Sequence, residues 1–354
     1  MVGAVHIAAP PSRTTLVPVV ALSVVLAASA VVAIGLGTAV VSPGDTARYL
    51  WSGFTGGIIR AEETTQYQII WQIRTPRVLL AVIVGAGLSV VGVAIQALVR
   101  NALADPFILG VSSGASVGAV VVSVFGVLAV FGVFAVSAGA FLGALGATFL
   151  VYLISYSRMG VLPLRLVLTG VAMSFGFQAV MSVIIYLAPS SEATSTVLFW
   201  SMGSFGAATW GALPVVAVAV VGGTVVLRRF GRPLDVLTLG DETASSLGVD
   251  ASSVRRGLFV LTAVMTGAMV AVSGAIGFVG LVIPHIVRIV LGAAHHRVLA
   301  VAPLVGAIFM VWVDLASRTL VAPRELPLGV ITALVGVPVF ITLMRRKAYL
   351  FGSR

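Results

Sequence analysis

The 354-residue sequence contains no cysteine, which excludes disulfide bonds, thiolate metal sites and cysteine nucleophiles. Charged residues make up only 9% of the chain, and its 21 basic residues include a single lysine, Lys347. A phosphate-binding loop of the Gly-x4-Gly-Lys-Ser/Thr kind needs a lysine followed by a hydroxyl residue, whereas Lys347 precedes Ala348. That kind of ATP site is therefore excluded from this chain. No convergent set of nucleophiles or metal ligands indicates an intramembrane enzyme.

Apolar residues, by contrast, make up 59% of the chain, which excludes a water-soluble protein. A helix that crosses a membrane needs about 20 apolar residues. The apolar runs fall at residues 16–41, 78–99, 107–128, 130–154, 164–188, 210–228, 256–277, 279–293, 299–322 and 327–344. We therefore predict an all-α fold of about ten transmembrane helices, with both chain ends on one side of the membrane.

The first apolar run raises the question of a signal peptide, since Ala28-Ser29-Ala30 resembles a cleavage site. A signal peptide has an apolar core of about 7–15 residues, and the run at 16–41 is much longer. We expect this segment to be retained as the first helix.

The net charge of +10 could indicate a nucleic-acid partner, but most arginines lie at the ends of the apolar runs. With a cytoplasmic amino terminus, fifteen of the 21 basic residues fall on the inner side and six on the outer side. The positive-inside rule then places both termini in the cytoplasm, so the expected partner is a bilayer and not nucleic acid. Nothing about membrane insertion favours the outer six, which are Arg48, Arg60, Arg74, Arg77, Arg318 and Arg324.

Two predicted loops are long enough to carry function. Residues 42–76 are expected to form an extracytoplasmic loop with an interfacial turn. In the inner loop, residues 229–255, apolar residues recur on both sides of Gly240, which predicts two short amphipathic helices hinged there. Asp241 and Glu242 suit the first turn of the second helix. The loop either lies on lipid as a linker or docks a cytoplasmic partner; we favour the partner, because arginine-rich flanks hold the loop at the membrane edge.

Residues 96–115 form a polar break between two apolar runs and contain Arg100, Asn101, Asp105 and Pro106. Unpaired polar groups are costly in lipid, so this segment must lie in water or line a protein cavity. Asp105-Pro106 also predicts a helix stop, because proline disfavours helical geometry in the residue before it.

Several motifs, in order along the chain, resemble those of the FecCD family, the permeases of bacterial ABC importers for iron chelates and vitamin B12. They are Ile73-Arg-Thr-Pro-Arg77 with Gly85-Ala-Gly-Leu88, residues 96–115, Leu168-Thr-Gly-Val-Ala172, Trp200-Ser-Met-Gly203, residues 239–248, residues 274–288, residues 314–318, Glu325-Leu-Pro-Leu-Gly329 and Gly336-Val-Pro338. The resemblance implies a vitamin B12 permease-like fold, with residues 1–354 as a single transmembrane permease domain.

The resemblance also implies functional residues at both ends of the molecule. On the inside it implies helices that couple to an ATPase, at Leu239, Gly240, Asp241, Glu242, Ala244, Leu247 and Gly248. On the outside it implies docking of a substrate-binding protein at Arg74, Arg77 and Arg318, because arginine pairs with carboxylates in an oriented, bidentate way. Anchoring to lipid headgroups is the alternative for Arg74 and Arg77.

A cytoplasmic gate is implied at Asn101 and Leu103. Its counterpart in the family lies in the turn between the fourth and fifth helices, where relatives tend to have small hydroxyl residues. The corresponding residues here are Leu162 and Pro163, so this chain departs from the family pattern at that position.

Two further patterns have simple explanations. Gly110, Gly114 and Gly118 recur at four-residue spacing, which favours close helix contact within one subunit over a seam between subunits. Asp314 lies four residues before Arg318, so we expect an ion pair along one helix in preference to a proton relay.

Together these features predict the permease subunit of an ATP-driven importer that moves a ferric siderophore across the cytoplasmic membrane by alternating access. Haem and cobalamin are alternative cargoes within the family; a proton-driven secondary transporter is the alternative of another class, but it would have no use for the loop at 239–248. The channel is expected at the seam between two permease subunits, lined by largely apolar helices. The expected partners are a second permease subunit, identical or different, two cytoplasmic ATPase subunits and an extracytoplasmic binding protein. No metal or other cofactor is expected in this chain, since ATP and Mg²⁺ would bind the ATPase.

Overall fold

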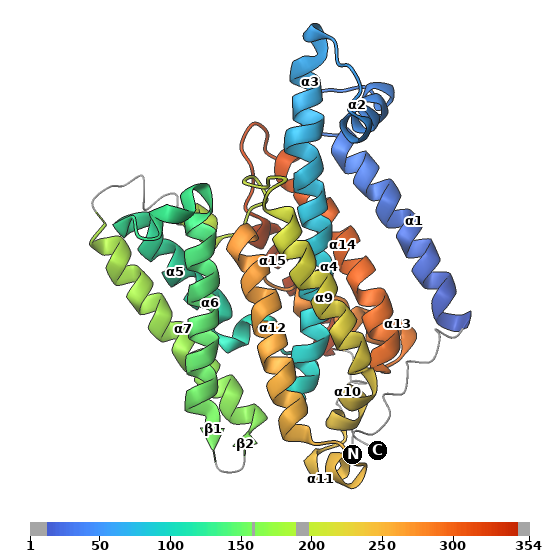
Figure 1. The fold of residues 1–354 in the computed structure, drawn as a ribbon. Coiled ribbons are helices and arrows are strands. Elements are labelled where there is room, and N and C mark those ends of the chain that lie inside the picture. Colours follow the sequence, from blue (N-terminus) through green and yellow to red (C-terminus); the bar gives the residue numbers. More distant parts are fainter. Residues whose placement is uncertain (1–12, 158–159, 189–197, 346–354) are drawn as a thin grey trace.

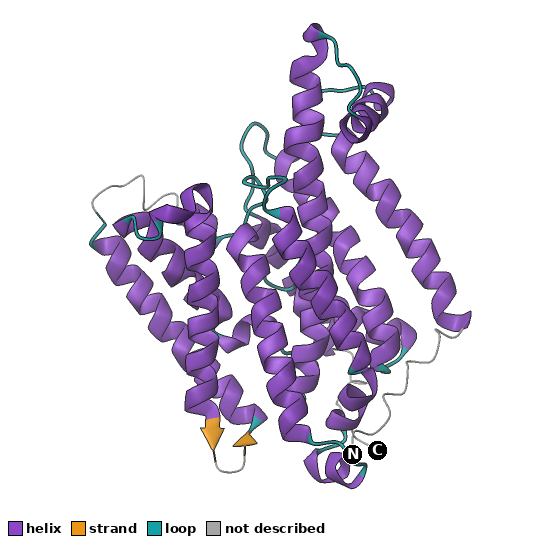
Figure 2. Ribbon diagram, in the orientation of Figure 1, coloured by secondary structure: helices purple, strands orange, loops and turns teal. Residues whose placement is uncertain are grey.

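The computed structural model describes residues 13–157, 160–188 and 198–345, and this part of the chain is almost entirely helical (Figure 1 and Figure 2). Its strands are the two-residue β1 (Tyr156–Ser157) and β2 (Gly160–Val161), which pair antiparallel. Both ends of the predicted domain 1–354 lie outside the described residues.

Each predicted apolar run coincides with one helix, so the polytopic all-α fold is confirmed. These helices are α1 (Arg13–Gly35), α4 (Thr75–Leu98), α5 (Val111–Phe125), α6 (Ala135–Ser155), α7 (Pro163–Tyr186), α9 (Leu213–Arg229), α12 (Ala251–Ser273), α13 (Val279–Leu291), α14 (His295–Thr319) and α15 (Leu328–Arg345). Among the described residues, seven helical stretches are long and apolar enough to cross a membrane alone. The shorter ones are α5, α13 and α9, and α9 is bent by 63° against α10 (Gly231–Thr238).

The segment 42–76, expected as a loop, is itself largely helical. It contains α2 (Pro43–Thr55), a single 3₁₀ turn (Ala61–Glu63), α3 (Thr64–Gln68) and a π-helical turn (Ile69–Arg74). The last three run on into α4, so that residues 61–98 form one helical stretch of 38 residues. Polar residues such as Glu62 and Gln66 hid this extension from a search for apolar runs, because the helix continues beyond its apolar part.

α4 lies at the centre of the helices that pack around it, and 20 of its 24 residues are buried. We call α4 and the helices packed around it the larger helix group. α4 packs against α9, α12, α13 and α14. Two glycines allow this: a Cβ atom on Gly85 would lie 2.3 Å from the carbonyl oxygen of Gly306, and one on Gly92 would lie 1.9 Å from that of Gly280. Helix contact in a membrane depends on such close backbone packing, because lipid tails are as apolar as the side chains.

α5, α6 and α7 form a second group beside α12 (Figure 1). A Cβ atom on Gly118 of α5 would lie 2.0 Å from the carbonyl oxygen of Gly139 of α6, and one on Gly114 would lie 2.7 Å from that of Gly143. The expectation that these glycines serve packing within one subunit is therefore confirmed for Gly114 and Gly118.

Several long helices, among them α1, α7 and α15, keep broad apolar faces that the other described residues do not cover. Only Leu166 and Gly170 are buried on α7, and α1 and α15 are also largely exposed. In a membrane these faces must meet lipid or another protein.

Candidate translocation and coupling sites

The polar break that follows α4 is a compact turn held by its own side chains. Arg100 adopts a left-handed backbone conformation with φ 52°. The Oδ1 atom of Asn101 accepts the backbone N–H of Leu103 at 2.9 Å. The turn thus satisfies polar backbone groups that a helix end leaves unpaired, and it exposes the predicted gate residue Asn101 while Leu103 is half-buried.

Asp105 and Pro106 begin a helical turn instead of ending a helix. The expected stop was placed here, but α4 already ends at Leu98. The Oδ1 atom of Asp105 accepts the N–H of Phe107 at 2.9 Å and so caps the 3₁₀ turn Pro106–Leu109. Proline suits the first position of such a turn, because it has no N–H to leave unpaired.

Gln96, which the sequence analysis did not single out as a site residue, anchors the break to α13. Its side chain is fully buried, and its Nε2 lies 3.3 Å from the carbonyl oxygen of Gly280 and 3.2 Å from that of Leu281. Its Oε1 accepts a hydrogen bond from Arg288. The sequence does show a polar amide and a guanidinium within apolar runs, which could have marked both residues. Their pairing could not be predicted, because they are 192 residues apart and meet only in the folded chain.

The inner loop forms two short helices, as predicted: α10 is followed by α11 (Asp241–Ser246), with Gly240 between them at φ 111°. Glycine is favoured there because other residues avoid positive φ. Of the predicted coupling residues, Leu239 and Leu247 are 64% and 60% exposed. Glu242 and Gly248 are exposed, Gly240 is half-buried and Ala244 is buried.

Asp241 turns toward the chain's own arginines. Its Oδ2 accepts a hydrogen bond from Nη1 of Arg255 at 2.8 Å, and its Oδ1 is shared by Arg255 and Arg100. The Arg255 hydrogen bonds, reinforced by the charge of Arg100, hold the pKa of Asp241 below its usual value. These three residues form what we call the inner Arg–Asp cluster; sequence analysis gave Asp241 an ATPase contact and missed both of its arginine partners.

The predicted counterpart of the gate lies beside this cluster. Leu162 precedes α7, and Pro163 occupies the first turn of that helix. Pro163 shares the lining of a small internal cavity with Leu98, at the end of α4, and with Arg255. The fold therefore brings the start of α7 next to the helix end that leads into Asn101.

Arg74 and Arg318 bind the carboxyl end of α1 and the residues just after it. Arg74 donates hydrogen bonds to the carbonyl oxygens of Ile34, Gly35 and Ala39, at 3.2, 2.8 and 2.6 Å. Arg318 donates to those of Ala33 and Leu36, at 2.8 and 3.3 Å. Cations are favoured at a helix carboxyl end, where carbonyl groups lack partners.

Arg77 joins two acidic residues from the carboxyl-terminal part of the chain. Its Nε donates to Asp314 at 2.6 Å, while Nη1 and Nη2 donate to the two oxygens of Glu325 at 2.7 and 2.9 Å. Arg318 Nε lies 3.1 Å from Asp314 Oδ2, which confirms the expected pair along α14.

Arg74, Arg77 and Arg318 are only 4%, 5% and 7% exposed. Their guanidinium groups are committed within the chain, so this structure presents none of them to a binding protein or to a lipid headgroup. Docking through these residues stays a prediction.

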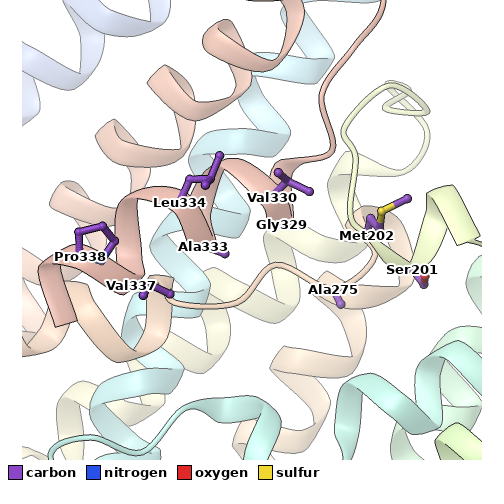
Figure 3. Close-up of a pocket in the computed structure, with 9 residues that line it drawn as sticks. All are labelled: Ser201, Met202, Ala275, Gly329, Val330, Ala333, Leu334, Val337 and Pro338. Atoms are coloured by element: carbon purple, nitrogen blue, oxygen red, sulfur yellow. The ribbon is translucent and has the colours of Figure 1, made fainter. Parts of the chain in front are cut away.

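Two adjoining grooves open on the same region and share Ser201. The apolar groove, about 640 Å³, lies between α15 and the residues Met202 and Ala275 (Figure 3). On α15 it is lined by Gly329, Val330, Ala333, Leu334, Val337 and Pro338. The serine groove, about 320 Å³, is lined by Phe107, Ser112, Ser113 and Ser116, and by Ser174, Gln178 and Met181 of α7. Among the residues that the structure describes, neither lining contains a charged one. The serine groove is more polar than the largely apolar channel that we expected.

A bundle of helices that can span a membrane, a polar turn between two of them and grooves on exposed helix faces define a multi-pass membrane transport protein. The chain belongs to the FecCD transport family, whose model matches residues 24–346.

Relatives extend this finding over most of the chain. It is 39% identical over 326 residues to an uncharacterized ABC transporter permease protein of Bacillus subtilis, covering 91% of both chains. It is 41% identical over 281 residues to the hemin transport system permease protein of Yersinia pestis, covering 78% of this chain and 84% of that one. A solved metal-chelate type ABC transporter in an inward-facing conformation matches with a TM-score of 0.80 and 33% identity, over 92% of this chain and 98% of that one.

Proposed function

We propose that this chain is the permease subunit of an ATP-driven importer that carries a ferric siderophore inward by alternating access. Two copies of the chain, or this chain and a related one, form the channel at their seam. ATP is hydrolysed on separate ATPase subunits, and a binding protein delivers the cargo. The chain lies in the cytoplasmic membrane with both termini on the inner side, as the distribution of arginines favours.

The observation that carries this proposal is the pair of grooves on uncovered helices. The serine groove lies against α7 and the apolar groove against α15, which are two of the least buried long helices. Grooves on an uncovered face are half of a passage, and a second permease subunit placed there would close them. Such a subunit would also cover apolar surface between the helices.

The lining favours a bulky chelate over a bare ion. A bare cation would need oxygen ligands of negative charge, and a free oxyanion would need basic groups. The described residues that line the two grooves include none with a charge. Hydroxyl and amide groups beside an apolar wall suit a cargo with polar substituents on a large body. Haem and cobalamin share these features, so they are the alternative cargoes.

The ATPase is expected at the end of the molecule that carries α10 and α11, opposite α2 and α3 (Figure 1). Leu239 and Leu247 are exposed there, outside the spans, and a protein partner would bury them. Burial of two leucine side chains is worth about 1.5–3 kcal/mol each when complete.

The binding protein is expected at the opposite end. Direct contact through Arg74, Arg77 or Arg318 would require their internal pairs to open. Arg77→Glu is compared with Glu325→Gln, which loosens the same internal pair but keeps the arginine. Weaker docking in Arg77→Glu alone would support direct contact, whereas an equal loss of docking in both variants would support a structural role alone.

The function is tested by uptake into proteoliposomes that contain the permease and its ATPase, with the binding protein added outside. ATP is enclosed in the vesicles, so that only permeases whose ATPase faces the lumen are active. Uptake of radioiron-labelled ferric siderophore is compared with uptake of haemin and cobalamin. ATP-dependent uptake of the siderophore is expected. Uptake that needs a proton gradient and no ATP would overturn the importer, and preference for haemin or cobalamin would replace the cargo.

The groove itself is tested by Ser174→Leu, which fills its wall. Uptake should fall while the ATPase still assembles with the permease. Ser182→Leu, on the same helix but outside both linings, is the matched control. Equal effects of the two changes would remove the serine groove from the passage.

A further inference from the structure

The guanidinium of Arg100 bonds to both helices of the inner loop, residues 229–255, which is the proposed coupling loop. Arg100 donates through Nη2 to Asp241, the first residue of α11, and through Nε to the carbonyl oxygen of Leu237 in α10, at 3.1 Å. It therefore bridges the two helices across the Gly240 hinge. Arg100 also immediately precedes Asn101, so the side chain that holds the loop belongs to the predicted gate segment.

The position of Arg100 in that segment is tightly defined. Its backbone is left-handed, its N–H donates to the carbonyl oxygen of Ala97, and the N–H of Asn101 donates to that of Gln96. Gln96 is in turn anchored to α13. A shift of the coupling loop would therefore act directly on residues 96–101, whose backbone is fixed at both ends by these hydrogen bonds.

The second arginine of the cluster leads to the other gate segment. Arg255 lies in the first turns of α12, and its side chain is 7% exposed. It packs in the cavity that Pro163 and Leu98 also line. The carboxylate of Asp241 thus contacts two arginines. Arg100 is next to Asn101 in the sequence, and Arg255 lines the same cavity as Pro163.

We propose that Asp241 is a positioning residue that links the coupling loop to both segments of the cytoplasmic gate through Arg100 and Arg255. The inference rests on the proposed importer function. In this role the Asp241 side chain faces the permease, and the exposed Leu239 and Leu247 face the ATPase. One carboxylate between two guanidinium groups is sensitive to neutralisation, because Asp241→Asn leaves two like charges facing each other.

The absence of cysteine allows a direct test on the assembled transporter. Leu103→Cys supplies the permease with a single thiol in the gate segment, and its rate of labelling by a maleimide reports whether the gate is open. The permease and ATPase complex is labelled without nucleotide and with a non-hydrolysable ATP analogue. We expect the two rates to differ by roughly five-fold or more, which is the lower range of coupling between sites in proteins.

Asp241→Asn added to this reporter should abolish the difference between the two rates. The complex should still assemble and hydrolyse ATP. Arg100→Gln, which keeps the Asp241–Arg255 pair, should reduce the difference in part, and Asp241→Glu should restore it. Arg232→Gln is the matched control, because it removes an exposed charge from α10 and lies outside the lining of that cavity.

The outcomes separate the possible roles. Loss of ATPase assembly in Asp241→Asn would make Asp241 an ATPase contact and overturn the proposal, and so would a normal response to nucleotide. A reporter that ignores nucleotide even with Asp241 intact would count against the importer function itself.

Discussion

Arg77 of α4 holds the carboxylate of Glu325 by two parallel hydrogen bonds, 2.7 and 2.9 Å long, while its Nε donates to the buried Asp314 of α14. Glu325 lies between α14 and α15. One guanidinium therefore fixes the start of α15, which forms the wall of the apolar groove, against the central helix. The residue assigned to an external partner from sequence is, in the folded chain, part of the frame of the groove.

Arg77→Gln should strongly destabilise the protein. It leaves Asp314, which is fully buried, with Arg318 alone, and breaking a buried ion pair costs roughly 3–5 kcal/mol. The measurement is thermal unfolding of the purified permease in detergent. Arg324→Gln removes an exposed charge from the same connecting segment and should change the midpoint little. Similar shifts for both variants would contradict the structural role of Arg77.

The contact between α5 and α6 predicts a second difference. Gly118→Val places a Cβ atom about 2.0 Å from the carbonyl oxygen of Gly139, which the backbone can relieve only by moving the helices apart. Overpacking of this kind costs roughly 1–3 kcal/mol or more. Gly146→Val, on α6 with nothing within 4 Å of the new Cβ, is the control. The yield of monodisperse protein and the unfolding midpoint should fall for Gly118→Val only, and an equal fall would show that the helices do not pack as described.

The positions of the helices were predictable because each span is an apolar run of the length that a bilayer requires. Their ends were less so. The run at 78–99 is part of a helical stretch that begins at Ala61, because the helix continues on the amino-terminal side of the apolar run through polar residues. The pair Asp314–Arg318 was predictable from four-residue spacing on one helix.

The pairs that define the sites were not predictable in this way. Arg77 and Asp314 are 237 residues apart, and Arg100 and Asp241 are 141 residues apart. No periodicity relates such residues, because their contact depends on how α4, α11 and α14 pack. Motif resemblance marked Arg77 and Asp241 as important, but it could not show that their charges are met within the chain.

Gly240→Pro tests the hinge of the coupling loop. Proline fixes φ near −65°, whereas Gly240 has φ 111°, so the change must reorient α11 relative to α10. We expect normal membrane insertion, measured by yield and by size-exclusion profile, together with loss of ATP-dependent uptake. Gly257→Ala, in α12 with open space around the new Cβ, should retain uptake. Normal uptake by Gly240→Pro would remove the coupling assignment.

The inner Arg–Asp cluster also predicts a pH dependence. The pKa of Asp241 is lowered in the folded protein, by the Arg255 hydrogen bonds first, so its contribution to stability is fully present above the ordinary aspartate pKa of about 4 and is lost as the pH falls through the lower, folded value. Because the Asp241 side chain is 45% exposed, this contribution should be about 1 kcal/mol or less.

The measurement is the difference in unfolding midpoint between the unmodified protein and Asp241→Asn, from pH 3 to pH 8. The difference should stay constant from pH 8 down to about pH 5 and shrink below about pH 4, where the carboxylate is protonated in the unfolded state but still charged in the folded one. The loss is complete once the pH has passed the lower, folded pKa. Subtracting the variant cancels the titration of the other acidic groups. A difference that changes between pH 6 and pH 8 would mean that the stabilising interaction of Asp241 depends on another titrating group, and the two arginines alone would not account for it.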